Sequence, residues 1–218
     1  MKIINVEQGS AAWKASRVGR VTASRIKDIL AQGKSGKESA SRADYRMQLA
    51  CEVLTREPQD DTFFSKEMAW GIEQEPFARG AYNASEGVIV DLVGMVIHPK
   101  DDRCAASPDG IVNWDGGESF DGLVEIKCPK TKTHVGYIQA GGVPTDYQPQ
   151  MLWQMACTGA RWCDFVSYDP RLPENLQLYI CRFERDDARI AEIEREVARF
   201  LDEVDCLVST LTKLGEAA

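Results

Sequence analysis

The sequence lacks the features that mark several broad classes of protein. Its 218 residues contain no uninterrupted run of about 18 apolar residues, so no membrane-spanning helix is expected. The first residues lack the apolar core of a signal peptide. No internal repeat, low-complexity tract or linker is visible. These absences favour one globular domain over residues 1–218, in a protein of the cytoplasm.

Cysteines are present but scattered. The seven cysteines are odd in number and form no close pair, which favours reduced thiols. Cys157, Cys163 and Cys181 lack the tight spacing of an iron–sulfur site, and visible absorbance would test that alternative. Cys104 and Cys128 invite a thiol-chemistry interpretation. No histidine partner is indicated for them, and a reduced core thiol is the simpler role.

A large positive charge is also absent. The net charge is −8, which argues against a protein that coats DNA over a broad surface. The distribution is uneven, because residues 1–50 hold ten Lys or Arg against four Asp or Glu, a net of +6. The rest of the chain therefore carries −14. This arrangement permits a basic N-terminal tract that leads to an acidic metal site, although a solvated basic face is the alternative.

Hydrophobic periodicity and turn residues predict an α/β fold. The chain is expected to form a mixed central β-sheet with helices on both faces. Strands are expected at residues 88–97, 104–113, 122–128, 163–168 and 176–184. Helices are expected at 43–55, 66–84 and 145–158, and a long amphipathic helix at about 186–213 follows a core at about 60–184.

The N-terminal tract contains a candidate anion site. Thr22 or Ser24 is expected to cap a short helix that runs through Leu30, and Arg17 stands shortly before it. A helix N-terminus with a hydroxyl group and an arginine suits a terminal DNA phosphate. A plain helix cap with surface arginines is the alternative.

Three residues in the strand region carry the candidate chemistry. Asp109, in a Pro-Asp-Gly turn, and Glu125, sixteen residues later, supply the oxygen ligands that Mg²⁺ prefers. Lys127 follows Glu125 by two residues, so both side chains are expected on one face of a strand. A hairpin of 104–113 and 122–128 would bring Asp109 beside Glu125. Such a site suits attack of water on a phosphodiester, with Lys127 as a base or as an electrostatic clamp.

The same pattern has plain structural interpretations. The Asp-Gly pair also fits an ordinary turn, and Glu-x-Lys also fits a solvated strand face. Glu75 lies in the expected helix at 66–84, where a third acid would complete the metal or water environment. In that helix Met68, Ile72 and Phe77 are expected to face the core.

Six short segments raise the functional interpretation well above these alternatives. In order along the chain they are WKASRVGRVTAS, AWGIEQE, AASPDG, VEIKCP, YQPQMLWQM and FVSYDPR. Each is weak alone, but the ordered set is highly specific. Over roughly residues 6–205 the chain resembles the phage lambda exonuclease and YqaJ-type viral recombinase family, within the PD-(D/E)xK nuclease superfamily.

The resemblance implies a role for each matched residue. Asp109 and Glu125, with the backbone carbonyl of Ile126, would bind metal, and Lys127 would act on the attacking water. Glu75 would support a second metal ion. The remaining matches are a 5′-phosphate pocket and residues near the DNA end and the scissile group, namely Arg17, Thr22 and Ser24 for the pocket, and Trp13, Ser107, Tyr147 and Gln150 for the rest.

The resemblance also implies an activity, cofactors and partners. Family members use Mg²⁺, for which Mn²⁺ is expected to substitute, with two ions expected per site. They digest one strand of duplex DNA from 5′ to 3′ into mononucleotides and leave a 3′ overhang. A ring-shaped homotrimer, a single-strand annealing partner and a phage or prophage origin in a bacterial host are implied as well. A site-specific or structure-specific endonuclease and a non-catalytic DNA-end-binding module are the alternatives.

Overall fold

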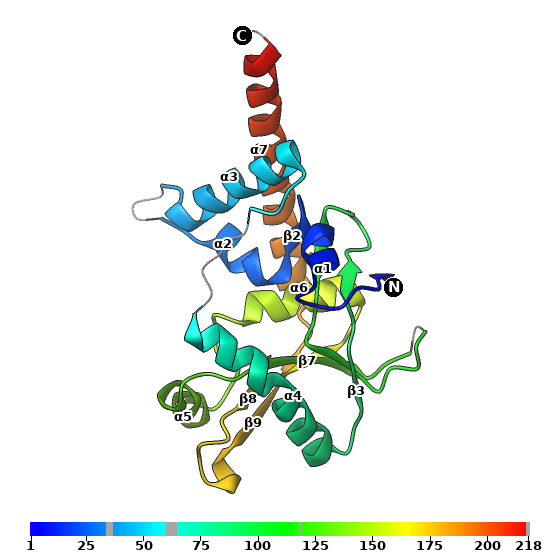
Figure 1. The fold of residues 1–218 in the computed structure, drawn as a ribbon, viewed down its shortest axis with the longest axis vertical. Coiled ribbons are helices and arrows are strands. Elements are labelled where there is room, and N and C mark those ends of the chain that lie inside the picture. The colour runs from blue at the N-terminus through cyan, green and yellow to red at the C-terminus, as the bar shows by residue number, and fades with distance from the viewer. Residues whose placement is uncertain (34–36, 60–64, 118, 217–218) are drawn as a thin grey trace.

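A computed structural model describes residues 1–33, 37–59, 65–117 and 119–216 (Figure 1). The helical elements are α1 (Ala11–Arg17), η1 (Ala23–Arg25), α2 (Ile26–Leu30), α3 (Ala40–Thr55), α4 (Lys66–Glu86), α5 (Thr131–Ala140), α6 (Gln148–Thr158), η3 (Glu174–Leu176) and α7 (Asp187–Glu216). The strands are β1 (Lys2–Ile4), β2 (Val21–Thr22), β3 (Val90–Asp91), β4 (Met95–Ile97), β5 (Cys104–Ala106), β6 (Gly110–Val112), β7 (Gly122–Lys127), β8 (Trp162–Tyr168) and β9 (Leu178–Glu184). Among these described residues, no helix combines the length and apolar character needed to span a membrane.

The predicted α/β domain is confirmed, but its strands form two mixed sheets where one was expected. One sheet has the strand order β1-β4-β5-β2, and the other has the order β3-β6-β7-β8-β9. In the five-stranded sheet β7 runs parallel to β8, and the other neighbouring strands are antiparallel. In the four-stranded sheet β2 runs parallel to β5. The central strand β7 is therefore enclosed on both sides by paired strands.

The division into two sheets corrects two strand predictions. The predicted strand at 88–97 is β3 in one sheet and β4 in the other, and the predicted strand at 104–113 is likewise β5 and β6. The expected hairpin is therefore limited to β6 and β7, where Gly110 pairs with Val124. An apolar run predicts extended backbone, but it does not report that the chain changes sheet within the run.

The long C-terminal helix α7 closes the core as its periodicity predicts. Its buried stripe comprises Ile190, Ile193, Val197, Phe200, Leu201 and Val204. Phe200 stacks on Tyr45 of α3, with ring centroids 5.2 Å apart. The last turns of α7 extend beyond the body of the molecule, at the end opposite the five-stranded sheet (Figure 1).

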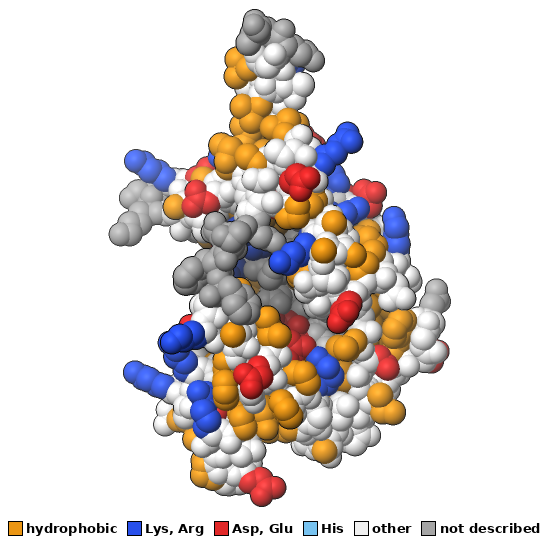
Figure 2. Space-filling model, in the orientation of Figure 1, with side chains coloured by type: hydrophobic (Ala, Val, Ile, Leu, Met, Phe, Trp, Pro, Cys, Tyr) orange, Lys and Arg blue, Asp and Glu red, His pale blue; other side chains and the backbone are white. Residues whose placement is uncertain are grey.

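The buried face of α4 differs from the prediction. Met68, Ile72 and Phe77 are 51%, 64% and 63% exposed, so the expectation that they face the core is wrong. Figure 2 shows apolar side chains exposed over α4. The helix is anchored instead by Tyr82, whose hydroxyl donates to the buried carboxylate of Asp164 at 2.8 Å. A buried polar anchor of this kind leaves no signature in hydrophobic periodicity.

Candidate active site

The carboxylate of Glu125 is the centre of the candidate active site. It lies on β7, between β6 and β8, and is completely buried. It accepts hydrogen bonds from the ammonium of Lys127 and from the side-chain amides of Gln150 and Gln154, each amide at 2.6 Å. Hydrogen bonds to the ionised form offset the cost of removing a carboxylate from water. Three side-chain donors therefore satisfy a carboxyl group that has no access to water.

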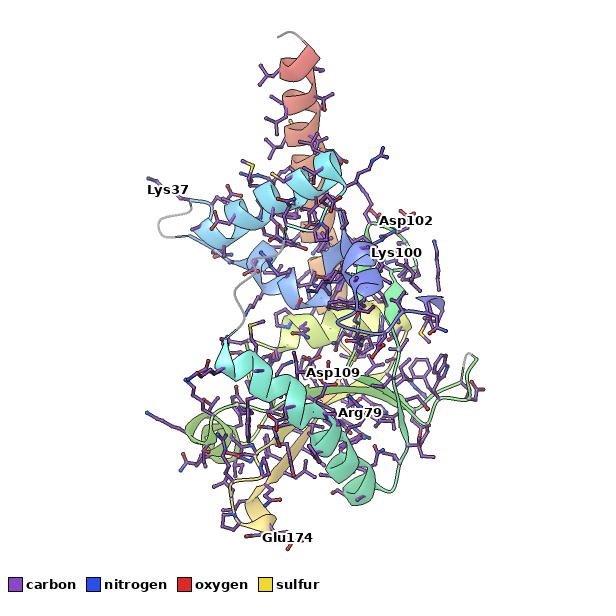
Figure 3. The ribbon with its side chains drawn as sticks, in the orientation of Figure 1. Lys37, Arg79, Lys100, Asp102, Asp109 and Glu174 are labelled. Carbon is purple, nitrogen blue, oxygen red and sulfur yellow. The ribbon has the colours of Figure 1, made fainter. Side chains whose placement is uncertain are left out.

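Asp109 brings a second carboxylate to the same place. It precedes β6 in the Pro-Asp-Gly turn, and its Oδ2 accepts a hydrogen bond from the backbone N–H of Ile126 at 2.7 Å. Burial raises the pKa of Asp109, and the negative charge of Glu125 raises it further. The predicted convergence of Asp109 and Glu125 is thus confirmed in its geometry. Figure 3 shows Asp109 at the middle of the molecule.

Lys127 completes the predicted triad. Burial lowers its pKa, but the charges of Glu125 and Asp109 outweigh burial and hold that pKa above its usual range. Lys127 is therefore an ammonium ion in this arrangement. Its Nζ also lies 5.3 Å from the centre of the Tyr147 ring. Tyr147 stands immediately before α6, so the Pro that follows at 149 occupies the first turn, where no hydrogen bond is lost.

The donor set fits a hard divalent cation. Two buried carboxylates side by side repel each other, which the raised pKa of Asp109 reports, and a cation between them would remove that repulsion. Within the described ranges, no three Asp, Glu, His or Cys side chains gather at a possible metal site. A cation here would accordingly need the Ile126 carbonyl and oxygens of water or substrate, as Mg²⁺ accepts. The same observation leaves the iron–sulfur alternative without a cysteine cluster in those ranges.

Glu75 approaches this pair from α4. Its negative charge contributes to the raised pKa of Asp109, so the two carboxylates lie within electrostatic range. Its Oε1 pairs with the guanidinium of Arg79, one helical turn along, at 2.5 Å. The role of Glu75 toward a second metal ion stays a prediction.

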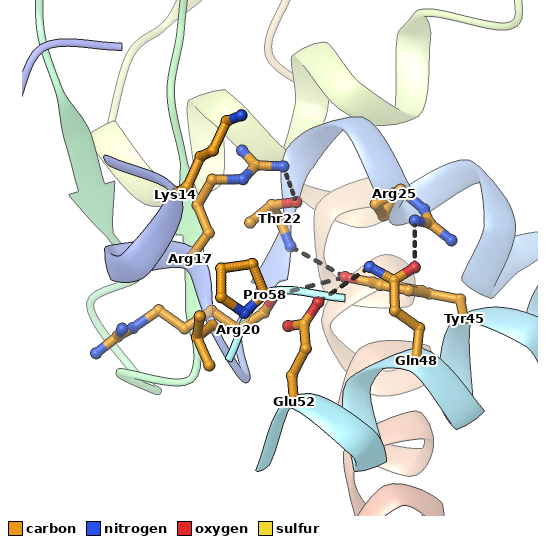
Figure 4. A pocket seen from close by; sticks show the side chains of 10 residues that line it. Lys14, Arg17, Arg20, Thr22, Arg25, Tyr45, Gln48, Glu52 and Pro58 are labelled. Atoms are coloured by element: carbon orange, nitrogen blue, oxygen red, sulfur yellow. Dashed lines mark hydrogen bonds between the residues drawn. The ribbon is translucent and has the colours of Figure 1, made fainter. Parts of the chain in front are cut away.

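A basic pocket forms where α1, β2 and α3 meet (Figure 4). Its volume is about 80 Å³, and its lining includes four cations, which are Lys14, Arg17, Arg20 and Arg25, together with Thr22, Tyr45, Gln48 and Glu52. Arg17 donates to the hydroxyl of Thr22 at 3.2 Å, so the two residues lie together in the pocket. Their role toward a 5′-phosphate stays a prediction. Ser24 is exposed on η1 and is not among the lining residues. Thr22 precedes η1 but makes no side-chain cap, and the residue before α2 is Arg25, so the expectation that Thr22 or Ser24 caps this helix is wrong.

The four cations of the pocket make different contacts. Arg20 donates to the backbone carbonyls of Asp102 and Ser16 at 2.8 and 2.6 Å. Arg25 pairs with Asp28 at 2.6 Å. Lys14 and Arg17 stand one turn apart on α1 and share one rim of the pocket in Figure 4.

Trp13 joins the basic pocket to the acidic site. The guanidinium carbon of Arg17 lies 4.2 Å from the centre of the Trp13 ring. On its other side, the indole N–H of Trp13 donates to the hydroxyl of Ser107 at 3.0 Å. Ser107 is two residues before Asp109. A chain of contacts therefore connects Arg17, Trp13 and Ser107, which come from separate segments of the sequence.

The sequence did not indicate a role for Gln154. It is completely buried, and its amide is one of the two that bind Glu125. Gln150 and Gln154 are four residues apart, so they lie on one face of α6. That spacing in YQPQMLWQM is a signal for a pair acting together, but a glutamine within an apolar helix also fits many structural roles. Lys14 and Arg25 of the basic pocket were likewise missed.

Comparison with known proteins places the chain in a family. Residues 12–161 match the YqaJ-like viral recombinase domain. The chain belongs to this family. The match includes the basic pocket, both acids, Lys127 and the two glutamines of α6. The resemblance stated from the six segments is thereby confirmed.

Solved structures agree with the family. The chain is 44% identical to an alkaline exonuclease (LHK-Exo) from Laribacter hongkongensis, with 96% of this chain and 100% of that chain covered and a TM-score of 0.85. The structure of LHK-Exo in complex with dAMP matches at 43% identity, with the same coverage and TM-score. A phage-related exonuclease from Haemophilus somnus shares the fold, at 16% identity, 88% and 96% coverage and a TM-score of 0.64. No curated protein sequence matches significantly.

Replacing Gln154 with Leu is expected to weaken metal binding at the acid pair. The substitution removes the donor from Glu125 Oε2 and leaves that oxygen buried without a partner. Loss of a hydrogen bond that orients a metal-binding carboxylate typically lowers metal affinity roughly 10- to 100-fold. Calorimetric titration with Mn²⁺ measures this affinity directly.

Thr158→Val is the matched control for this substitution. Thr158 is buried on the same helix and donates to the backbone carbonyl of Gln154 at 2.8 Å. The substitution therefore perturbs α6 without removing a hydrogen bond to Glu125. Metal affinity should stay near the wild-type value in this variant. Equal losses in the two variants would assign the effect to general damage of α6.

Proposed function

We propose that this protein is a metal-dependent exonuclease that digests the 5′-phosphorylated strand of duplex DNA from its end. The products are mononucleotides and a 3′ overhang. Family membership, the 44% identity to an alkaline exonuclease and the dAMP complex of that relative support a DNA exonuclease. Metal dependence and polarity are supported by the chemistry of the two sites in this chain.

The observation that carries the proposal is the connection between the two sites. A basic pocket around Arg17 and Thr22 is joined through Trp13 and Ser107 to the turn that bears Asp109. An acid pair alone would serve an endonuclease equally well. A neighbouring anion pocket gives an enzyme a way to recognise a chain terminus, because a terminal phosphate carries more charge than an internal diester. The connected pair therefore favours digestion from a 5′ end.

The residues at and around the acid pair have different roles in the proposed hydrolysis. When bound, Mg²⁺ would supply an activated water molecule and neutralise charge on the phosphate. Asp109, Glu125 and the Ile126 carbonyl would hold it, and Gln150 and Gln154 keep the Glu125 carboxylate in one orientation. The ammonium of Lys127 lies against Glu125, where it can stabilise developing negative charge or position the attacking water. In the arrangement seen here its raised pKa favours the electrostatic role.

The proposal includes an assembly, partners and a location that rest on family resemblance. A ring-shaped homotrimer would enclose the duplex whose end is being digested. A single-strand annealing protein would receive the 3′ overhang. Both would act in the cytoplasm of a bacterial host, where phage or prophage recombination takes place.

Strand choice tests the proposed polarity. A blunt duplex with a 5′-phosphate on only one strand is incubated with the protein and Mg²⁺, and each strand is followed by a separate label. The phosphorylated strand should shorten from its 5′ end while the other strand survives. Loss of both strands at the same rate would contradict the polarity. Nicking of covalently closed circular duplex in the same reaction would favour an endonuclease.

Arg17→Ala is expected to reduce the preference for phosphorylated ends more than it reduces duplex binding. Arg17 is the pocket cation that contacts both Thr22 and the Trp13 ring. Loss of one charge-assisted contact corresponds to roughly a tenfold or larger fall in the ratio of kcat/KM for phosphate over hydroxyl ends. The ratio is measured with otherwise identical duplexes. An unchanged ratio would remove Arg17 from phosphate recognition.

Lys127→Ala is expected to abolish cleavage while end binding in the presence of metal persists. The substitution removes the ammonium group but keeps Asp109 and Glu125. Fluorescence anisotropy of a labelled phosphorylated duplex measures binding, and release of nucleotides measures cleavage. Normal turnover by this variant would remove Lys127 from the mechanism. Lys132→Ala, an exposed lysine on α5, is the matched control and should cleave normally.

A further inference from the structure

The chain crosses between the two sheets at two short links. Residues 92–94 connect β3 of the five-stranded sheet to β4 of the four-stranded sheet. Residues 107–109 connect β5 of the four-stranded sheet to β6 of the five-stranded sheet. A change in the angle or spacing between the two sheets would therefore alter the conformation of these links.

One side chain binds both links. The amide nitrogen of Gln8 donates to the carbonyl of Val93 at 2.8 Å and to the carbonyl of Pro108 at 2.9 Å. A primary amide has two N–H groups, so both are used and each holds a different link. Gln8 precedes β3 and β6 by more than 80 residues in sequence, and neither bond belongs to a regular element.

The backbone next to Gln8 also approaches the first link closely. A Cβ atom at Gly94 would lie 2.4 Å from the carbonyl oxygen of Val6 and 2.5 Å from that of Ile4. Glycine is therefore required at this position, because any side chain would push the two segments apart. The N-terminal segment is packed into the junction of the sheets, and Gln8 is its polar anchor there.

The two sites of the proposed function lie on opposite sides of this junction. Thr22 of the basic pocket is on β2 in the four-stranded sheet, whereas Glu125 is on β7 in the five-stranded sheet. Asp109 is the last residue of the second link. Helix α1, which carries Arg17, begins three residues after Gln8. The distance between the pocket and the acids therefore depends on how firmly the links are held.

We propose that Gln8 is a positioning residue that sets the spacing between the basic pocket and the acid pair, and thereby fixes the product at one nucleotide. This inference rests on the proposed function. If the end phosphate is held in the pocket, the linkage that reaches the acids is determined by that spacing. Relaxing the junction would let other linkages reach the acids and would uncouple phosphate recognition from cleavage.

Gln8→Leu tests the inference, because leucine keeps the apolar bulk and removes both donors. The substrate is a duplex labelled on its 5′-phosphate, and the length of the released labelled product is scored. The wild type should release only the mononucleotide, and Gln8→Leu should also release longer products. Its preference for phosphate over hydroxyl ends should fall roughly tenfold or more, since small misplacements of reacting groups have effects of up to about a hundredfold.

Gln177→Leu is the matched control. The amide of Gln177 also donates to two backbone carbonyls, those of Pro170 at 3.2 Å and Leu172 at 2.9 Å, but it lies outside both links. This variant should release only mononucleotides and keep the wild-type phosphate preference. Thermal unfolding of both variants shows whether they are folded. If Gln8→Leu does not fold, Gln8→Asn keeps an amide that is one methylene shorter and should give the same change in product length.

The outcomes separate this inference from the proposed function. A wild-type protein that ignores the end phosphate would overturn the proposed polarity, and the inference with it. A wild-type protein with strong phosphate preference, together with folded Gln8 variants that keep this preference and release only mononucleotides, would overturn the inference alone. Longer products from Gln177→Leu as well would also overturn it, because the effect would then be general loosening.

Discussion

The rest of the site depends on the burial of one carboxyl group. Glu125 is completely enclosed on β7, and a bare charge there would be too costly to persist. The ammonium of Lys127 and the amides of Gln150 and Gln154 make it tolerable. Because those amides come from α6, the packing of that helix against the sheet also positions the Glu125 carboxyl group. The same contacts therefore contribute to the stability of the fold and to the geometry of the site.

The second constraint is that the site is assembled across two sheets. A single continuous sheet would place a basic pocket and an acid pair on one rigid surface. Here β5 and β6 belong to different sheets, and Asp109 stands where the chain crosses from one to the other. The hydrogen bond from Trp13 to Ser107 and those from Gln8 fix this crossing from the N-terminal side. The N-terminal segment thus serves as part of the site's framework as well as its basic rim.

The sequence could predict the local chemistry and most elements, but not the junction. Asp109, Glu125 and Lys127 were candidates from residue type and spacing, because a strand repeats every two residues and a turn precedes it. The resemblance carried by the six segments raised them above the plain structural alternatives. The sheet crossing near Gly94 could not be read, since the backbone contact that requires glycine comes from a distant segment. Gln154 was missed for a related reason. Its role is defined by a partner on β7, and periodicity describes only the helix itself.

The acidic balance of the chain is consistent with a protein that acts on ends. Non-specific binding along a duplex grows with the number of phosphates that basic side chains neutralise, and a net charge of −8 keeps that contribution small. The N-terminal cations are themselves partly committed, as Arg20 and Arg25 bind carbonyls and Asp28. Arg17 is engaged as well, with the Thr22 hydroxyl and the Trp13 ring, and it lines the pocket together with Lys14. Under the proposed function, such a distribution favours a terminal phosphate in the pocket over internal backbone phosphates elsewhere on the surface.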